Sequence, residues 1–89
     1  MTIRESKVES DIRKYAEKRG WWQCKFTSPS LRGVPDRIFI RAGRHVFIEV
    51  KRPGKKATAQ QKKRHVDMRE KGAEVYVIDC VEDAYAILE

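Results

Sequence analysis

Two runs of apolar and β-branched residues, separated by a short glycine-containing turn, lie near the middle of the chain. They occupy residues 36–51, which read DRIFIRAGRHVFIEVK. Runs of this length and composition are typical of β-strands, and residues 41–44 are short enough to connect them directly. The sequence therefore predicts a β-hairpin with strands at residues 36–40 and 45–51.

The residues before the hairpin predict a helix, a strand and a loop. Apolar residues recur at helical spacing from Val8 to Gly20, and Thr2 and Glu5 can form a capping box, so we expect a helix over about residues 3–19. A strand is expected at residues 21–27. One face of that strand carries Trp22, Cys24 and Phe26. The following segment, residues 28–35, is rich in turn-forming residues and long enough to be functional.

The residues after the hairpin predict a second helix, a fourth strand and a short terminal helix. Thr58 can cap a helix that runs to about Lys71 and stops at Gly72, and residues 74–78 and 82–88 follow as strand and helix. The order is helix, three strands, helix, strand, helix. We therefore predict an α/β fold with a small mixed sheet flanked by helices, in which the strands before and after the second helix are parallel neighbours.

The second predicted helix has an unusual inner face. Residues at positions 61, 65, 68 and 72 share one side of a helix, and this side is barely apolar. These residues are Gln61, His65, Met68 and Gly72. The basic faces of the same helix are then expected in water or against a partner.

Length and charge indicate one small domain with a polyanionic partner. The chain has 89 residues and a formal net charge of +7, and we expect residues 1–89 to form a single domain. Residues 51–71 hold nine basic and two acidic side chains, whereas residues 72–89 hold no basic and five acidic ones. The positive charge is thus local, as expected for a nucleic-acid-binding surface, although a solvated helix face can also carry such charge.

Cysteine content and hydropathy exclude several classes of protein. Cys24 and Cys80 are too few for a disulfide framework or a four-cysteine zinc site, and we expect both to be reduced. No segment approaches the roughly 20 apolar residues of a membrane span, and the N-terminal residues do not resemble a signal peptide. The sequence predicts a soluble intracellular protein of the cytoplasm or nucleoid with no membrane association.

Three polar side chains are expected to meet at one end of the hairpin. Glu49 and Lys51 share a face because they are two residues apart in a strand, and antiparallel pairing brings Asp36 close to them. Two adjacent carboxylates repel each other unless a cation or proton compensates, and Mg²⁺ prefers such oxygen ligands. A bound Mg²⁺ ion can activate a water molecule for attack on a phosphate, and Lys51 could then orient that water. Taken separately, Glu49 and Lys51 could be a surface ion pair, and Asp36 a turn residue.

Four motifs occur in order along the chain: Glu9 in the first helix, residues 33–36 (GVPD), residues 49–51 (EVK), and residues 58–61 (TAQQ) opening a helix. Taken together, they resemble the VRR-NUC family of the PD-(D/E)xK nuclease superfamily. The resemblance extends from about Glu9 to Val77. It implies a restriction-endonuclease-like core of αβββαβ order. It also implies a compact homodimer like those of Holliday-junction resolvases.

The resemblance also implies roles for individual residues. Asp36, Glu49 and the Val50 carbonyl would bind Mg²⁺ or Mn²⁺, Glu9 would complete the metal environment, and Lys51 would be the catalytic lysine. The glutamine that supports the site would be Gln61. Glu5 lies one turn before Glu9 and Gln60 precedes Gln61, so each is an alternative, although helical periodicity favours Gln61. Independently of the family, Glu9 could cap the helix behind Ser6, and Gln61 could be a surface residue of the first helical turn.

The charge and the candidate metal site together predict a structure-selective DNA endonuclease that acts on four-way junctions or flaps. Phosphate contacts are expected from seven basic residues, Arg52, Lys55, Lys56, Lys62, Lys63, Arg64 and Arg69. The alternative is a non-catalytic nucleic-acid-binding module on the same scaffold. His45 and His65 are expected to be packing or surface residues, and Trp21 and Trp22 core or dimer contacts.

Overall fold

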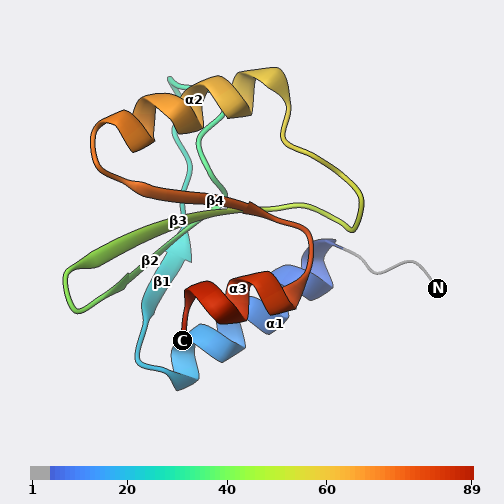
Figure 1. The fold of residues 1–89 in the computed structure, drawn as a ribbon, viewed down its shortest axis with the longest axis vertical. Helices are drawn as coiled ribbons and strands as arrows, with labels where there is room; N and C mark the ends of the chain where they lie inside the picture. Colours follow the sequence, from blue (N-terminus) through green and yellow to red (C-terminus); the bar gives the residue numbers. More distant parts are fainter. Residues whose placement is uncertain (1–4) are drawn as a thin grey trace.

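The structure is a computed structural model, and it describes residues 5–89. It consists of three helices and four strands in the order expected from the sequence, which confirms the predicted α/β class (Figure 1). The elements are α1 (Glu5–Lys18), β1 (Trp22–Lys25), β2 (Arg37–Arg41), β3 (Arg44–Val50), α2 (Ala59–Glu70), β4 (Glu74–Ile78) and α3 (Val81–Ile87). The predicted cap residue Thr2 lies outside the described residues.

The four strands form one mixed sheet in the order β1-β2-β3-β4. The first three strands are antiparallel neighbours, and β3 pairs with β4 in parallel, as expected for two strands joined by a helix. The hairpin closes through Ala42 and Gly43, whose φ angles of 50° and 82° are both in the left-handed region. Positive φ at both central residues is the geometry of the tight turns that fit the twist of a hairpin.

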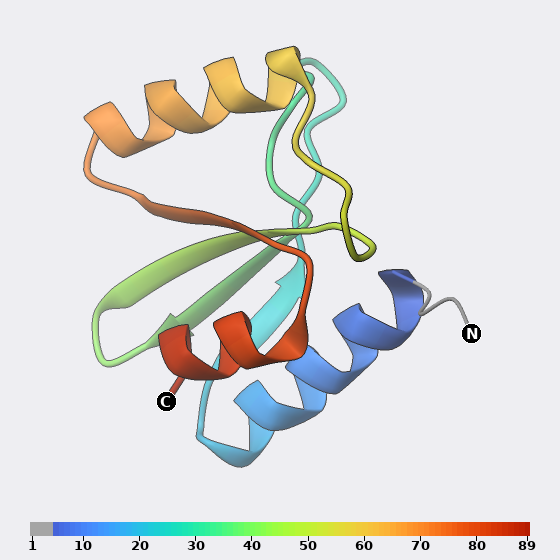
Figure 2. The same ribbon diagram turned by 45° about the vertical axis from the view of Figure 1, so that its right-hand side comes forward.

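Helices cover both faces of the sheet. Helices α1 and α3 lie on one face, and α2 lies on the other (Figures 1 and 2). The main core lies between the sheet and helices α1 and α3, where Ile12, Phe39, Ile48 and Leu88 have no exposed surface. Because side chains alternate along a strand, Ile48 and Val50 point into this core, and Glu49 points to the α2 side.

The strand β1 is shorter than predicted and begins one residue later. Trp21 precedes it and is buried, with its indole N–H donating to the Leu88 carbonyl oxygen at 2.9 Å. Trp22, the first residue of the strand, is 58% exposed. The two tryptophans differ in burial because Trp21 packs in the layer of α1 and α3, whereas Trp22 lies on the opposite face of the sheet, at the β1 edge. On that face α2 packs over β4, at the other edge, and leaves Trp22 uncovered.

The inner stripe of α2 has the polar character expected from the sequence. His65 is 1% exposed, and Gln61 and Met68 are half-buried. Thr58 caps the helix, since its side-chain oxygen accepts a hydrogen bond from the Gln61 backbone N–H at 3.1 Å. Within residues 5–89 no helix is long and apolar enough to cross a membrane.

Candidate active site

The hairpin brings Asp36 next to the end of β3. Asp36 immediately precedes β2, and its Oδ2 accepts a hydrogen bond from the Val50 backbone N–H at 2.9 Å. Its own carbonyl oxygen accepts from the Phe26 N–H at 2.8 Å, which fixes the segment before the strand. The carboxylate of Asp36 is therefore held against the backbone that carries Glu49 and Lys51, as the strand pairing predicted.

Glu49 is the most buried carboxylate of this group, with 2% of its surface exposed. Its Oε2 lies 3.4 Å from Lys51 Nζ and 3.3 Å from Gln61 Nε2. Its Oε1 is buried and has no hydrogen-bond partner among residues 5–89. Burial, followed by the negative charge of Asp36, raises the pKa of Glu49 to about 7, and the Lys51 ammonium opposes this shift.

Gln61 is both a capping residue and a contact of the buried carboxylate. Its side-chain oxygen accepts a hydrogen bond from the Thr58 backbone N–H at 2.9 Å, which completes a capping box. Its amide nitrogen donates to Glu49. The two interpretations of Gln61 are thus compatible, because opposite ends of one amide serve the helix and the carboxylate. Gln60 is exposed.

Glu9 is engaged in a salt bridge that the sequence analysis missed. Its Oε1 accepts a hydrogen bond from Arg37 Nε at 2.7 Å, and Arg37 is itself 8% exposed. Glu9 also lines a cavity of about 180 Å³ together with Glu5 and Asp36. Both candidate carboxylates of α1 therefore lie beside the same cavity as Asp36, and Glu5 stays an alternative to Glu9. Arg37 could have been found from the two-residue period of β2, which puts it on the inner face with Phe39.

The Arg37 contact distinguishes Glu9 from the other two carboxylates expected at the metal site. The Arg37 guanidinium compensates the charge of Glu9. Asp36 and Glu49 have no arginine partner within the described part of the chain. Repulsion between carboxylates is therefore concentrated on these two residues.

The oxygen atoms at this end of the sheet fit a hard divalent cation. Asp36 and Glu49 both place carboxylates there, and carboxylate oxygens are ligands that Mg²⁺ and Mn²⁺ prefer. A buried carboxylate oxygen without a partner is unfavourable unless a cation or proton approaches it, and Glu49 Oε1 is such an atom. The residues present therefore fit a metal ion.

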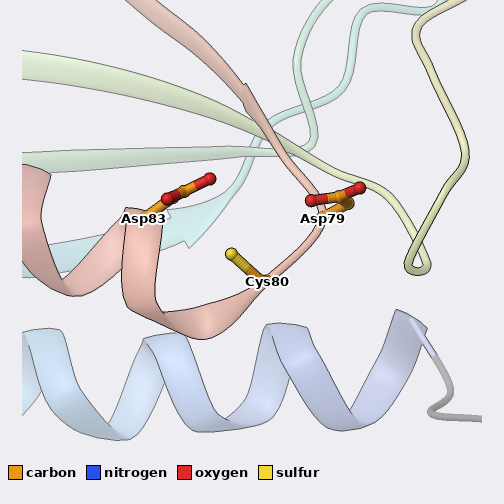
Figure 3. A group of neighbouring side chains, drawn as sticks. All are labelled: Asp79, Cys80 and Asp83. Atoms are coloured by element: carbon orange, nitrogen blue, oxygen red, sulfur yellow. The ribbon is translucent and has the colours of Figure 1, made fainter.

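A second group of possible ligands lies at the junction of β4 and α3. Side-chain ligand atoms of Asp79, Cys80 and Asp83 lie within 4.8 Å of one another (Figure 3). Asp79 Oδ2 already accepts from the Gly54 N–H at 3.0 Å. A backbone hydrogen bond with Asp83 lowers the pKa of the Cys80 thiol, but desolvation and the Asp83 carboxylate outweigh it, so the net shift is upward and disfavours the thiolate that metals bind.

The seven basic residues expected to contact phosphate fall into two groups. Arg64 donates to the Arg32 carbonyl oxygen and to Asp67, and Arg69 donates twice to the Val75 carbonyl oxygen, so both arginines have structural partners. The others are exposed: Arg52, Lys55, Lys56, Lys62 and Lys63. The exposed group follows the candidate site along the loop and the first turns of α2.

The two histidines and two cysteines have different surroundings. His45 is exposed, whereas His65 is buried and its Nε2 has no hydrogen-bond partner among residues 5–89. Burial, followed by the positive charges of Arg69 and Lys51, lowers the pKa of His65, so the imidazole is neutral at pH 7. Cys24 and Cys80 are both free.

The fold and the cluster at the strand ends define a class of α/β proteins with paired carboxylates beside a lysine. No protein-family model matches the sequence. A protein of Acyrthosiphon pisum secondary endosymbiont phage 1, described as "Putative nuclease p44", is 38% identical over 87 residues, which are 97% of this chain and 92% of that protein.

Solved structures of VRR_NUC domains have the same fold. One, described as "VRR_NUC domain", superposes with a TM-score of 0.74 and 27% identity over 90% of this chain and 92% of the other. Another, a "VRR_NUC domain protein", has a TM-score of 0.84 and 18% identity over 98% of this chain and 86% of its own, which is evidence for the fold alone. The chain belongs to the VRR-NUC family.

Proposed function

We propose that residues 1–89 form a single nuclease domain that hydrolyses phosphodiester bonds in DNA with the help of Mg²⁺ or Mn²⁺. The observation that carries this proposal is the convergence of Asp36, Glu49 and Lys51 at one end of the sheet. Support comes from the relative described as a nuclease and from the VRR_NUC domain structures.

The metal ion would be held by Asp36, Glu49 and the Val50 carbonyl oxygen, and Glu9, which lines a cavity together with Asp36, would complete its environment. When bound, such an ion lowers the pKa of a water molecule and offsets negative charge on the phosphate. Gln61 holds Glu49 through its amide nitrogen and so fixes the direction of the carboxylate. The burial of Glu49 limits competition from bulk water for its oxygen atoms.

Lys51 would orient the attacking water and hold charge next to the reacting phosphate. Its Nζ lies 3.4 Å from Glu49 Oε2, and its side chain is 16% exposed, so the ammonium can be reached from solvent while it remains paired. An ammonium donates up to three hydrogen bonds. One can go to Glu49, which leaves others for a water molecule and a phosphate oxygen.

The substrate is proposed to be branched DNA, such as a four-way junction or a flap, recognised by its backbone. Exposed lysines and arginines contact phosphates without reading sequence. A homodimer would place two such sites on one branched substrate. Trp22, 58% exposed at the edge of the sheet, supports a self-association surface.

The experiment that tests this function uses labelled linear, flap and four-way DNA incubated with Mg²⁺, Mn²⁺ or chelator. We expect metal-dependent products that are most abundant from branched DNA. Glu49→Ala and Lys51→Ala should each reduce the cleavage rate by at least about 100-fold while DNA binding persists. Glu70→Ala, which removes an exposed carboxylate of α2, is the control.

Two results would contradict the proposal. Undiminished cleavage by both Glu49→Ala and Lys51→Ala would show that the reaction occurs elsewhere or comes from a contaminant. Salt-sensitive DNA binding by the wild-type protein with no products under any metal condition would identify the alternative, a binding module on a nuclease scaffold.

A further inference from the structure

A cavity of about 520 Å³ lies between α2, β4 and the loop that precedes α2. Its walls include His65 and Val66 from α2, and Val77 from β4. Its volume is within the range of about 300–1,000 Å³ that small-molecule sites occupy. Asp36 and Glu49 do not line it, so the cavity is separate from the candidate metal site.

The rim of the cavity is cationic. Lys55 and Lys56 reach it from the loop and Lys62 from α2, and within residues 5–89 none of the three forms an ion pair. Asp79 is the acidic residue on the wall, and its Oδ2 accepts a hydrogen bond from the Gly54 N–H. Three lysines, together with Arg69 on the wall, against one carboxylate leave a net positive charge, which favours a phosphate group.

The walls of the same cavity are apolar. Val66 is 48% exposed and Val77 is 37% exposed, and they come from two different elements. A single exposed valine needs no explanation, but two that meet in one cavity form a surface that an apolar or aromatic group can cover. A small inorganic anion would leave this surface in water.

One buried polar atom remains without a partner in the wall. His65 lines the cavity, is 1% exposed, and has an Nε2 with no hydrogen-bond partner in the described part of the chain. An unmet buried donor or acceptor is unfavourable, but this atom lies below the accessible surface of the cavity. The cavity thus offers a ligand a cationic rim and an apolar wall.

We propose that this cavity binds a nucleotide, with the phosphate at Lys55, Lys56 and Lys62 and the base against Val66 and Val77. A nucleotide combines the two required features, namely an anion and a flat ring system with apolar faces. The nucleotide can belong to a single strand of a nucleic acid or be a free mononucleotide. The site shares no residue with the carboxylate cluster, but Lys55, Lys56 and Lys62 are also among the residues proposed to contact DNA phosphates, so for a nucleic-acid strand as ligand it rests on the proposed function.

Chemical-shift titrations of the isotope-labelled full chain, in chelator, test this site without cleavage. The probes are deoxyadenosine monophosphate, inorganic phosphate, deoxyadenosine and a four-residue deoxyadenosine oligonucleotide. We expect the mononucleotide to shift the Val66 and Val77 amides and the His65 imidazole, with a dissociation constant at least about tenfold below those of phosphate and of the nucleoside. Equal affinities for phosphate and the mononucleotide, or shifts confined to other residues, would overturn the proposal.

A matched pair of variants checks the rim. Lys62→Ala should weaken mononucleotide binding by about fivefold through loss of a charge-assisted contact, whereas Lys71→Ala, which removes an exposed lysine at the opposite end of α2, should not change it. Equal effects of the two variants would contradict the placement of the phosphate.

The oligonucleotide identifies the source of the nucleotide. A tighter dissociation constant for the four-residue oligonucleotide than for the mononucleotide supports a strand of nucleic acid as ligand. Equal constants support a free mononucleotide. Because both measurements are made in chelator, a failed nucleotide titration does not bear on the cleavage assay, and a failed cleavage assay does not bear on the titration.

Discussion

Glu49 is held in an environment that is unfavourable for a carboxylate in the metal-free protein. It is 2% exposed, has an oxygen without a partner within residues 5–89, and lies beside Asp36. The pKa of the group rises from 4.5 to about 7, so ionisation in the folded protein is less favourable than in the unfolded chain. Residues that serve a site are often retained at the expense of stability.

We therefore predict that Glu49→Gln stabilises the metal-free protein while it abolishes cleavage. The amide keeps the shape of the side chain and removes the buried charge, which should raise the free energy of unfolding by about 1 kcal/mol and the melting temperature by about 4–8 °C. This gain in the free energy of unfolding should grow between pH 4.5 and about 7, because the wild-type carboxyl ionises in the unfolded chain at a lower pH than in the folded protein. Above about pH 7 it should be constant, because the carboxyl is then ionised in both states. Calorimetry in chelator measures it, and Glu70→Gln is the control. A lower melting temperature at pH 8 would contradict it.

Gly33 is required by a close approach as well as by its conformation. Its φ is +88°, and a Cβ at this position would lie 2.8 Å from the Gln60 carbonyl oxygen and 3.2 Å from Arg64 Cβ. Gly43 has a similar φ of +82° but nothing within 4 Å of the same point. The two glycines separate the conformational effect from the steric effect.

We expect Gly33→Ala to lower the free energy of unfolding by about 2 kcal/mol more than Gly43→Ala, because only the first adds a clash between the 28–35 loop and α2. Urea unfolding of both variants measures the difference. Equal losses would show that the loop moves away from α2 without penalty.

At the scale of elements, Gln61 in the first turn of α2 both caps the helix and contacts the candidate site. The Gln61 oxygen serves the cap and its nitrogen serves Glu49, so the two roles can be separated by changing one end of the side chain. A glutamate fills the same position in a capping box, because only the accepting oxygen is needed there.

We predict that Gln61→Glu keeps the helix and reduces cleavage by at least about tenfold, because a second carboxylate replaces the amide that donates to Glu49. Gln60→Glu makes the same charge change one residue away on an exposed position and should have a much smaller effect. Circular dichroism and cleavage rates measured side by side provide the readout. Equal activity losses would favour a general electrostatic effect over the Gln61 contact.

The sequence predicted the elements and missed pairings between them. Local periodicity and turn residues predict the order of the elements, the hairpin and the parallel crossover. Strand pairing predicts that Asp36, Glu49 and Lys51 are neighbours. The Arg37–Glu9 salt bridge joins α1 to β2, and the Arg64 and Arg69 contacts join α2 to a loop and to β4. Such contacts depend on how elements pack, which sequence periodicity does not specify.

At the scale of the whole molecule, the sheet is covered unequally. Helices α1 and α3 cover one face, while on the other face α2 packs over β4 and the opposite edge ends at β1 (Figure 2). Trp22 lies at that edge directly across from Ile40, 58% exposed beside a half-buried neighbour. A chain of this size hides only about 60% of its unfolded surface, so association gives it a further way to bury apolar area.

This unequal cover leads to a prediction about self-association. If Trp22 lies in a symmetric dimer interface, one substitution changes the interface on both copies. Trp22→Glu should then weaken the dimer by at least about 2 kcal/mol. We expect the variant to sediment as a monomer at micromolar concentration in sedimentation velocity. Val66→Glu introduces the same charge at a 48% exposed apolar position on α2, away from the β1 edge, and should leave the dimer intact. A dimer that survives Trp22→Glu but dissociates in Val66→Glu would move the interface from the β1 edge to the surface around Val66, next to β4. A monomeric wild-type protein would contradict the proposed homodimer.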